Sequence, residues 1–258
     1  ITGALGFIGS HISEHYLLKG DEVFGVDNQS GKYPADLYHY NRSLLVKHKL
    51  FSCYSMDIKH RTGLDALIKT VSPNVVVHTA ALTGVRDGAN HPYQYVSNNT
   101  LGTQNLLEAC RKKDNIKIIL LSSSSVYGET GTVPFTEEDP CDKPVSIYAA
   151  TKRSTELIAR TYSNLFNMDI TALRFFTVYG PWGRPDMALF SFTKNILEDK
   201  PIELFNNGTM RRDFTYIDDI VNGFMLALEN RQKGFEVFNL GRGAPETLEN
   251  FVSILEHT

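Results

Sequence analysis

The sequence predicts an α/β fold in which a doubly wound parallel sheet is followed by a smaller C-terminal region. Two observations predict it. Apolar runs of the buried-strand type, such as residues 74–78 and 116–121, alternate with helical patterns as far as Phe176. A Pro/Gly-rich loop and short strand-like pieces then replace this alternation. We therefore expect one domain in residues 1–176 and a second, smaller region in residues 177–258.

A glycine-rich turn, Gly3–Gly9, opens the chain and precedes a helix expected to run to about Lys19. Its glycines allow a tight turn and let a pyrophosphate approach the N–H groups at the helix N-terminus. A strand at residues 22–26 follows and ends in Asp27, near the spacing expected of a carboxylate on the adenosine ribose. This order predicts a Rossmann dinucleotide site. Asp27 favours NAD over NADP because it would repel a 2′-phosphate.

Small or polar residues also follow the later strands. A strand at residues 51–56 ends in Asp57–Ile58, which either contacts an adenine or caps the next turn. Small residues at 79–81 would let a cofactor lie close, whereas His78 before them is interpreted as a packed histidine. A long helix expected over residues 91–113 carries further candidates. The expected cofactor-binding residues are Gly3, Gly6, Phe7, Ile8, Gly9, Asp27, Asp57, Ile58, Ala80 and Asn99, together with Tyr148 and Lys152.

Tyr148 and Lys152, four residues apart, open a helix expected over residues 146–166 and share one of its faces. An ammonium beside a phenol favours the phenolate, so we expect the pKa of Tyr148 to fall below its usual value of about 10. Tyr148 would then act as a general acid or base, and a serine of the run at residues 122–125 could complete the proton path. With a dinucleotide site, this predicts oxidation of a sugar hydroxyl. The spacing alone is weak evidence.

Composition argues against several classes of protein. The net charge is −3 and Lys and Arg form no large cluster, so no nucleic-acid partner is expected. The three cysteines form no Cys-x-x-Cys pair, which argues against a disulfide framework or a metal site and fits a reducing, cytoplasmic location. No apolar run approaches the roughly 18 residues of a membrane span. The chain looks trimmed at both ends, so an anchor upstream of Ile1 stays open.

These motifs together resemble the extended short-chain dehydrogenase/reductases. The resemblance rests on the Gly3–Gly9 turn, the Ser-Ser-Val-Tyr-Gly stretch ending at Gly128, and Tyr148-x-x-x-Lys152, and it covers essentially the whole chain. Two long runs, residues 173–187 and 211–219, are similar to the UDP-glucuronate 4-epimerase group in particular. The Gly84-Val-Arg86 stretch matches that group as well.

The resemblance implies roles for individual residues. Tyr148 would be the acid/base, Lys152 would lower its pKa and bind the nicotinamide ribose, and Ser123 would touch the reacting hydroxyl. The implied cofactor is a tightly held NAD, and the implied substrate is a UDP-sugar oxidised and reduced again at C4. Helices starting near His91 and Ser146 would pair in a homodimer. The implied substrate-binding residues are Arg86, Ser124, Ser125, Thr177, Arg184 and, at the UDP phosphates, Arg212.

Two positions depart from related enzymes. Dehydratases carry an acidic pair after the catalytic Ser/Thr, and decarboxylases carry a Glu two residues before the Val-Tyr-Gly tyrosine; here Ser124 and Ser125 stand there. These serines favour 4-epimerisation of UDP-glucuronate to UDP-galacturonate over dehydration. A UDP-glucose or UDP-N-acetylhexosamine 4-epimerase, a UDP-glucuronate decarboxylase and a non-catalytic nucleotide-sugar sensor remain as alternatives.

Overall fold

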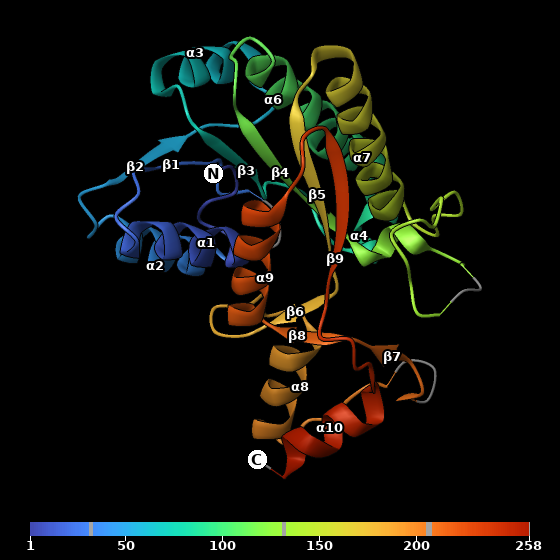
Figure 1. The fold of residues 1–258 in the computed structure, drawn as a ribbon. Coiled ribbons are helices and arrows are strands. Elements are labelled where there is room, and N and C mark those ends of the chain that lie inside the picture. Colours follow the sequence, from blue (N-terminus) through green and yellow to red (C-terminus); the bar gives the residue numbers. More distant parts are fainter. Residues whose placement is uncertain (31–32, 131–132, 205–207, 258) are drawn as a thin grey trace.

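The computed structural model describes residues 1–30, 33–130, 133–204 and 208–257, and it confirms the α/β fold class (Figure 1). A parallel sheet forms its centre. The strands pair in the order β3-β4-β5-β9, and β1 pairs with β2. Thr2 bridges to both Val26 and His78 and so joins these two parts. The strands are β1 (Val23–Asp27), β2 (Phe51–Ser55), β3 (Val75–His78), β4 (Lys117–Ser123), β5 (Asp169–Phe175) and β9 (Phe235–Leu240).

Apolar side chains alternate between the two faces of the central strands and build a core on each. On β4, Ile118 and Leu120 face one core, whereas Ile119 and Leu121 face the other. The first core lies under α3, α6 and α7, and the second lies under α1 and α9 (Figure 1). The helices are α1 (Phe7–Leu18), α2 (Ala35–Leu45), α3 (Arg61–Val71), α6 (Gly102–Cys110), α7 (Ile147–Phe166) and α9 (Ile217–Asn230).

The single helix expected over residues 91–113 is interrupted. It begins as α5 (Pro92–Tyr95), widens to a π-helix over Val96–Leu101 and continues as α6. A further short helix, α4 (Val85–Asn90), precedes it and was not expected. The wider turn buries two consecutive residues, Asn98 and Asn99, on the side of the sheet's carboxyl edge.

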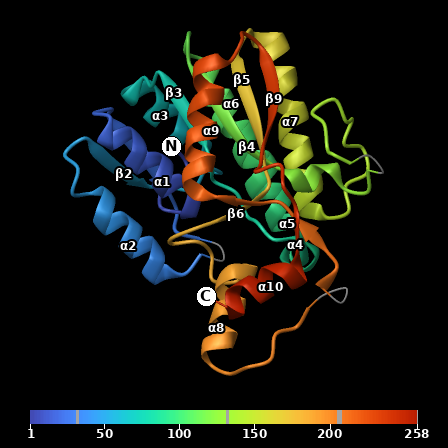
Figure 2. The same ribbon diagram turned by 60° about the horizontal axis from the view of Figure 1, so that its bottom comes forward.

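The smaller region lies beyond the carboxyl ends of the strands (Figures 1 and 2). Its short strands pair as β6 with β8 and β7 with β10. Of the strand-like pieces expected after Phe176, the one that begins at Pro201 forms no strand over residues 201–204, since its proline cannot donate a hydrogen bond; Phe205 lies outside the described residues. The elements are β6 (Thr177–Tyr179), α8 (Ala188–Leu197), β7 (Arg211–Arg212), β8 (Phe214–Tyr216), β10 (Glu246–Thr247) and α10 (Leu248–Glu256).

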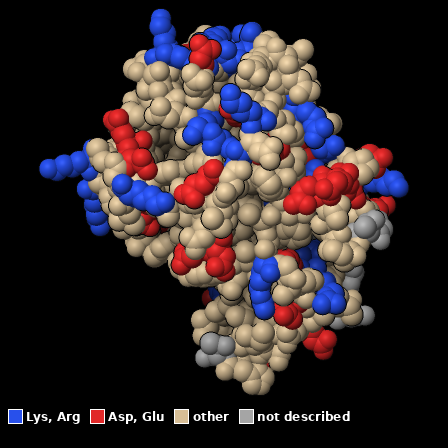
Figure 3. All heavy atoms as spheres, in the orientation of Figure 1, with Lys and Arg blue, Asp and Glu red and all other residues tan. Residues whose placement is uncertain are grey.

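The chain returns to the sheet after residue 176. β9 pairs in parallel with β5, and α9 packs on the second core through Ile220 and Phe224. The sheet expected within residues 1–176 therefore takes its last strand from the C-terminal part of the chain. On the face drawn in Figure 3, acidic and basic side chains are interspersed. Among the described residues, no helix is both long and apolar enough to cross a membrane.

Candidate active site

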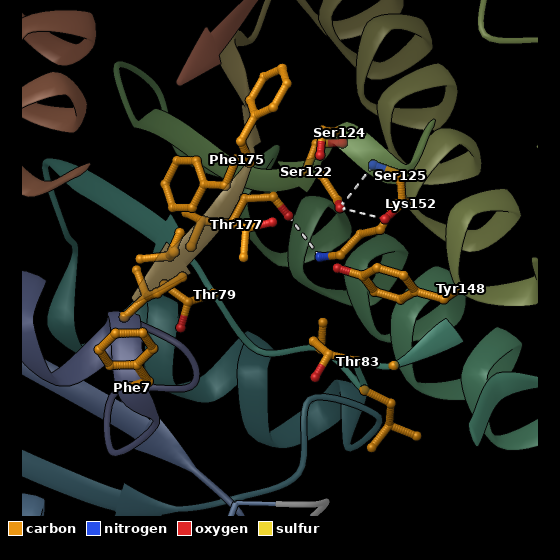
Figure 4. Close-up of a pocket in the computed structure, with 18 of the residues that line it drawn as sticks. Phe7, Thr79, Thr83, Ser122, Ser124, Ser125, Tyr148, Lys152, Phe175 and Thr177 are labelled. Carbon is orange, nitrogen blue, oxygen red and sulfur yellow. Dashed lines mark hydrogen bonds between the residues drawn. The ribbon is translucent and has the colours of Figure 1, made fainter. Parts of the chain in front are cut away.

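A cavity of about 1220 Å³ lies at the carboxyl edge of the sheet, between the strand ends and the C-terminal region. This edge is where ligands bind in open α/β sheets. Figure 4 shows Tyr148 and Lys152 on one wall of the cavity and Phe7 and Thr79 on the opposite wall. The cavity therefore faces both motifs predicted from the sequence.

The glycine turn forms one end of the cavity. A Cβ on Gly9 would lie 2.0 Å from the carbonyl oxygen of Gly3, and Gly3 has a φ of +67°. Helix α1 starts at the N-cap Gly6 without a side-chain cap and without an acidic residue in its first turn. Its first N–H groups thus remain available to an anion. The lining residues from this turn are Gly3, Gly6, Phe7, Ile8 and Gly9.

Asp27 lines the cavity at the end of β1. Its carboxylate accepts hydrogen bonds from the backbone N–H groups of Leu5, at 3.0 Å, and Gln29, at 2.7 Å. Burial raises the pKa of Asp27, and these two bonds oppose the rise. A hydroxyl donor such as a ribose suits this acceptor, so the residues present fit an adenosine dinucleotide.

Two expected cofactor residues lie outside the cavity lining, whereas Ala80 and Ile58 line it. Asp57 accepts from the Lys59 N–H at 2.8 Å and from Asn28 at 3.1 Å, so it caps the turn, which was the other reading of this residue. Asn99 is buried and uses its amide to bond both backbone groups of Leu82, at 2.8 and 2.9 Å. Its contacts position the cavity wall, and its neighbour Asn98 lines the cavity instead.

Tyr148 and Lys152 lie in the first turns of α7, whose N-cap Ser146 accepts from the Ala149 N–H at 3.0 Å. Lys152 is buried and donates from Nζ to the carbonyl oxygen of Leu121 at 2.7 Å (Figure 4). Burial lowers the pKa of Lys152 to about 8. His78 is packed as expected, between Thr2 and Thr103.

The expected fall in the pKa of Tyr148 is wrong for this structure. Burial raises that pKa, while a hydrogen bond with Ser123 and the charge of Arg184 oppose the rise. A neighbouring lysine charge alone would lower the pKa of the phenol, but desolvation of the phenol raises it. The lysine ammonium is also directed to Leu121 rather than to the phenol.

The serine run turns sharply at the end of β4. Ser123 caps a 3-10 turn, Ser124–Tyr127, by accepting from the Ser125 N–H at 3.1 Å. The hydroxyls of Ser123 and Ser125 lie 3.1 Å apart, and both serines line the cavity together with Ser124. The tight turn therefore brings three neighbouring hydroxyls to one wall.

The substrate-side residues come from several distant segments. Thr177, Arg184 and Arg212 all line the cavity. Arg184 forms a bidentate pair with Asp186, at 2.9 and 2.5 Å, and donates to the hydroxyl of Thr83. The backbone of Arg86 falls in α4, and its side chain lies outside the described part of the structure.

Comparisons with known proteins agree with this geometry. The family model described as "NAD dependent epimerase/dehydratase family" matches residues 1–241. The chain belongs to this family. The resemblance to the extended short-chain dehydrogenase/reductases is thereby confirmed.

Relatives in the NAD dependent epimerase/dehydratase family include a plant and a bacterial protein. The chain is 45% identical to UDP-glucuronate 4-epimerase 4 of Arabidopsis thaliana over 272 residues, which covers 99% of the chain but only 62% of that protein. It is 43% identical to UDP-glucuronate 4-epimerase of Thermodesulfobacterium geofontis, covering 99% of the chain and 79% of that protein. The chain thus spans less than two thirds of its plant relative.

A crystal structure of UDP-glucuronic acid 4-epimerase from Bacillus cereus, in complex with UDP-glucuronic acid and NAD, is also similar. It superposes with a TM-score of 0.92 at 41% identity, covering 99% of this chain and 81% of that one. UDP-glucose 4-epimerase from Thermotoga maritima, with UDP-glucose, gives a TM-score of 0.87 at 30% identity, covering 99% and 80% of the two chains.

In this member of the NAD dependent epimerase/dehydratase family, sequence reasoning missed several residues. Thr83 meets Arg184, and Asn239 lines the cavity from the end of β9. Arg174 and Glu156 form an ion pair beneath the serine run, with 1% of each side chain exposed. The small-residue run at 79–81 lies just before Thr83 and was a nearby signal for it. The other contacts join segments that are distant in sequence, and nothing local in the sequence indicates them.

Proposed function

We propose that this chain interconverts UDP-glucuronate and UDP-galacturonate by 4-epimerisation, with NAD as cofactor and a 4-keto sugar as intermediate. One arrangement carries the proposal: Tyr148 with its Ser123 partner faces the cavity, and hydroxyls stand at positions 124 and 125. The names of the plant, Thermodesulfobacterium and Bacillus relatives support the same reaction and ligands.

The cofactor side of the cavity suits NAD. The glycine turn and the N-terminus of α1 would hold the pyrophosphate, Asp27 the adenosine ribose and Lys152 the nicotinamide ribose. Asp27 would repel the 2′-phosphate of NADP. When bound, NAD supplies the hydride acceptor and donor for C4 of the sugar.

Tyr148 would take the proton of the sugar 4-hydroxyl and return it after the 4-keto sugar has rotated to present its other face. Its hydrogen bond with Ser123 and the charge of Arg184 both favour the phenolate against the effect of burial. Ser123 is held for this role by the Ser125 N–H, at 3.1 Å. The chain's own groups thus provide the proton path and its orientation.

The hydroxyls of Ser124, Ser125 and Thr177, at the uronate group of the substrate, would determine the product. Oxidation at C4 of a glucuronate gives a β-keto acid, which loses CO2 when its carboxylate bond stands perpendicular to the new carbonyl. Ser124, Ser125 and Thr177 can hold the carboxylate near the carbonyl plane by hydrogen bonds. A carboxylate side chain at position 125, as in the decarboxylating relatives, would repel it. Arg184 lines the same cavity, where its guanidinium is paired with Asp186.

Two arginines from another segment would bind the phosphates of the UDP part of the substrate. Arg211 and Arg212 form β7 and line the cavity, and a guanidinium matches phosphate oxygens in geometry and charge. Arg212 keeps one nitrogen on the carbonyl oxygen of Arg211, at 3.0 Å, which leaves its other donors for a phosphate.

Product analysis tests the proposal. The full-length protein is incubated with UDP-glucuronate, and the nucleotide sugars are separated and identified by mass spectrometry. We expect UDP-galacturonate with little UDP-pentose, and much slower conversion of UDP-glucose or UDP-N-acetylglucosamine. UDP-pentose as the main product would move the chain to the decarboxylases, whereas preference for a neutral sugar would favour the other epimerases. Absence of turnover on every UDP-sugar would support a sensor.

We also propose a homodimer formed by α5, the π-helical turn and α7. These neighbouring elements expose large apolar side chains, including Tyr93, Val96, Leu101, Leu157 and Leu165. Such residues on adjacent helices mark an interaction surface, and a two-fold axis would cover both copies at once. Light scattering at micromolar concentration should give twice the monomer mass, and Leu157→Glu with Leu165→Glu should give the monomer.

The proposed location is the cytoplasm, where nucleotide sugars and NAD are available. Cys53, Cys110 and Cys141 are free thiols, which suits a reducing compartment. Fractionation of cells that express the full-length protein, followed by immunodetection, would check this location.

A further inference from the structure

A buried ion pair, Arg174 with Glu156, lies directly beneath the serine run. Arg174 donates through Nε and a terminal nitrogen to the two carboxylate oxygens of Glu156, both at 3.0 Å. Only 1% of either side chain is exposed. Burying such a pair is costly, and apolar residues of similar size are often as stabilising or more so. Stability alone therefore gives a weak account of this pair.

The Arg174–Glu156 pair is hydrogen-bonded on both sides of the serine turn, the 3-10 turn Ser124–Tyr127. Before the turn, Ser122 donates to Glu156 at 2.5 Å. At the last residue of the turn, Arg174 donates to the hydroxyl of Tyr127 at 2.9 Å. Glu156 lies on α7 one turn after Lys152, and Lys152 itself donates to Leu121, the residue before Ser122. Strand β4 and helix α7 are thus fastened to each other at the proton-transfer site.

The same bonds continue to a third wall of the cavity. The Tyr127 hydroxyl donates to Asn239 at 2.7 Å, and Asn239 donates to the carbonyl oxygen of Phe135 at 3.2 Å. The Phe135 ring also stacks on Tyr127, with centroids 4.5 Å apart. Asn239 and Phe135 line the cavity, whereas Glu156 and Arg174 do not. The pair therefore acts through other residues.

We propose that the Arg174–Glu156 pair is a positioning device for proton transfer, holding Ser123 on β4 in register with Tyr148 and Lys152 on α7. This role deepens the proposed function and rests on it. The pair touches neither the substrate nor the cofactor; it fixes the relative position of the groups that do.

The charges of the pair also act on Lys152. Burial alone would raise the pKa of Glu156, but its bonds from Arg174 and Ser122 outweigh burial and lower that pKa, so Glu156 is a carboxylate. Burial lowers the pKa of Lys152 to about 8, and Glu156 opposes this. In the described part of the structure, the other titratable or charged groups around the pair and Lys152 include Arg153 and Tyr148 on α7, Tyr127, Asp139 and Cys141 after β4, His78 on β3, the Ile1 amino group, Tyr95 on α5, and Arg184.

Substitution of the two partners should affect the basic limb of the pH–rate profile differently. Glu156→Gln removes the charge that opposes the effect of burial on the pKa of Lys152, so Lys152 loses its proton at a lower pH, by about one unit. Arg174→Met leaves that carboxylate in place, so its limb should stay closer to the wild-type position. Loss of register in either variant should lower kcat by about 10-fold to 100-fold while KM for UDP-glucuronate stays within about twofold.

Matched controls separate positioning from ordinary structural damage. Glu108→Gln removes a carboxylate that also bonds an arginine, Arg111 at 2.8 Å, and a tyrosine, Tyr162 at 2.7 Å, away from the cavity. It should leave kcat and both limbs unchanged. Tyr127→Phe keeps the stacking on Phe135 but deletes two hydrogen bonds, and it should lower kcat several-fold without moving either limb. The double variant Glu156→Gln/Arg174→Met also lacks the carboxylate, so its limb should match that of Glu156→Gln.

NAD binding, measured by calorimetry across the same pH range, provides a readout without turnover. If the pH dependence of NAD binding shifts in Glu156→Gln but not in Arg174→Met while the wild type is inactive on UDP-sugars, the proposed function fails and the charge coupling stands. An active wild type whose pair variants lose melting temperature and activity, but show the same basic limb, would overturn the positioning role. If Glu156→Gln does not fold, the double variant and Tyr127→Phe decide: wild-type kcat in both contradicts the proposal.

Discussion

The two ends of the cavity are built in different ways. At the cofactor end, the consecutive Gly3–Gly9 turn contributes five lining residues, and its chemistry comes from backbone N–H groups. At the substrate end, Ser123, Tyr148, Thr177 and Arg212 come from four separate segments, and their chemistry comes from side chains. The glycine turn is thus local and depends on the absence of side chains, whereas the substrate end depends on tertiary contacts that hold side chains in place.

The largest expected effect is at the substrate end. Tyr148→Phe removes the acid/base but keeps the ring that packs edge-on to Tyr95. Turnover should fall by about 10³-fold, within the usual range for a general acid/base. Affinity for UDP-glucuronate, measured by calorimetry, should change little because the phenol acts in the transition state. Near-normal turnover in this variant would remove Tyr148 from the mechanism.

Gly9→Ala tests the cofactor end. Its new methyl group would lie 2.0 Å from the Gly3 oxygen, so the turn must deform. We expect NAD affinity to fall by about 100-fold and the melting temperature to drop, as for other strained backbone sites. Gly6→Ala is the matched control, because its methyl would lie 3.4 Å from the same oxygen. Gly6→Ala should melt near the wild type, and equal melting of both variants would contradict this account of the turn.

Thr177→Ala tests whether the hydroxyls at the substrate end control the product. Loss of one bond to the uronate should lower turnover by about 10-fold, the effect of a single hydrogen bond to a charged group. The fraction of UDP-pentose should rise at the same time, as measured by mass spectrometry of the nucleotide sugars. Thr215→Ala is a suitable control, since Thr215 bonds Asp213 and does not line the cavity. A pentose fraction unchanged in Thr177→Ala would argue against the clamp.

The last prediction concerns the stability of the fold and its pH dependence at Lys152. Burial holds the folded-state pKa of Lys152 near 8, below its ordinary value of 10.5, so charging it in the fold at pH 7 costs free energy. Lys152→Met should therefore be more stable than the wild type at pH 7, by about 1–3 kcal/mol. The gain should shrink as the pH rises from about 8 to 10.5, where the wild-type lysine is neutral in both states. Chemical denaturation at pH 7 and pH 10 measures it, and a constant difference would contradict the pKa.

Sequence patterns were reliable where one short segment holds all the information. The glycine turn, Asp27 and the helix over residues 146–166 were all predicted, because periodicity and glycine spacing report local backbone geometry. Predictions that needed a neighbour were weaker. Asp57 and Asn99 bear the right groups, but Asp57 caps its own turn and Asn99 bonds the backbone of Leu82. Polarity alone does not indicate which way a side chain points.

The sequence by itself determined the fold class, the glycine turn with Asp27, and the Tyr148–Lys152 pair, since helical spacing and strand alternation are properties of the local chain. Only the tertiary structure decided what surrounds that pair. It placed Lys152 on the Leu121 carbonyl, raised the pKa of Tyr148 by burial, and put Arg174 and Glu156 beneath the serine turn. Desolvation and hydrogen bonds between segments distant in sequence set these properties, and neither leaves a signal in residue spacing.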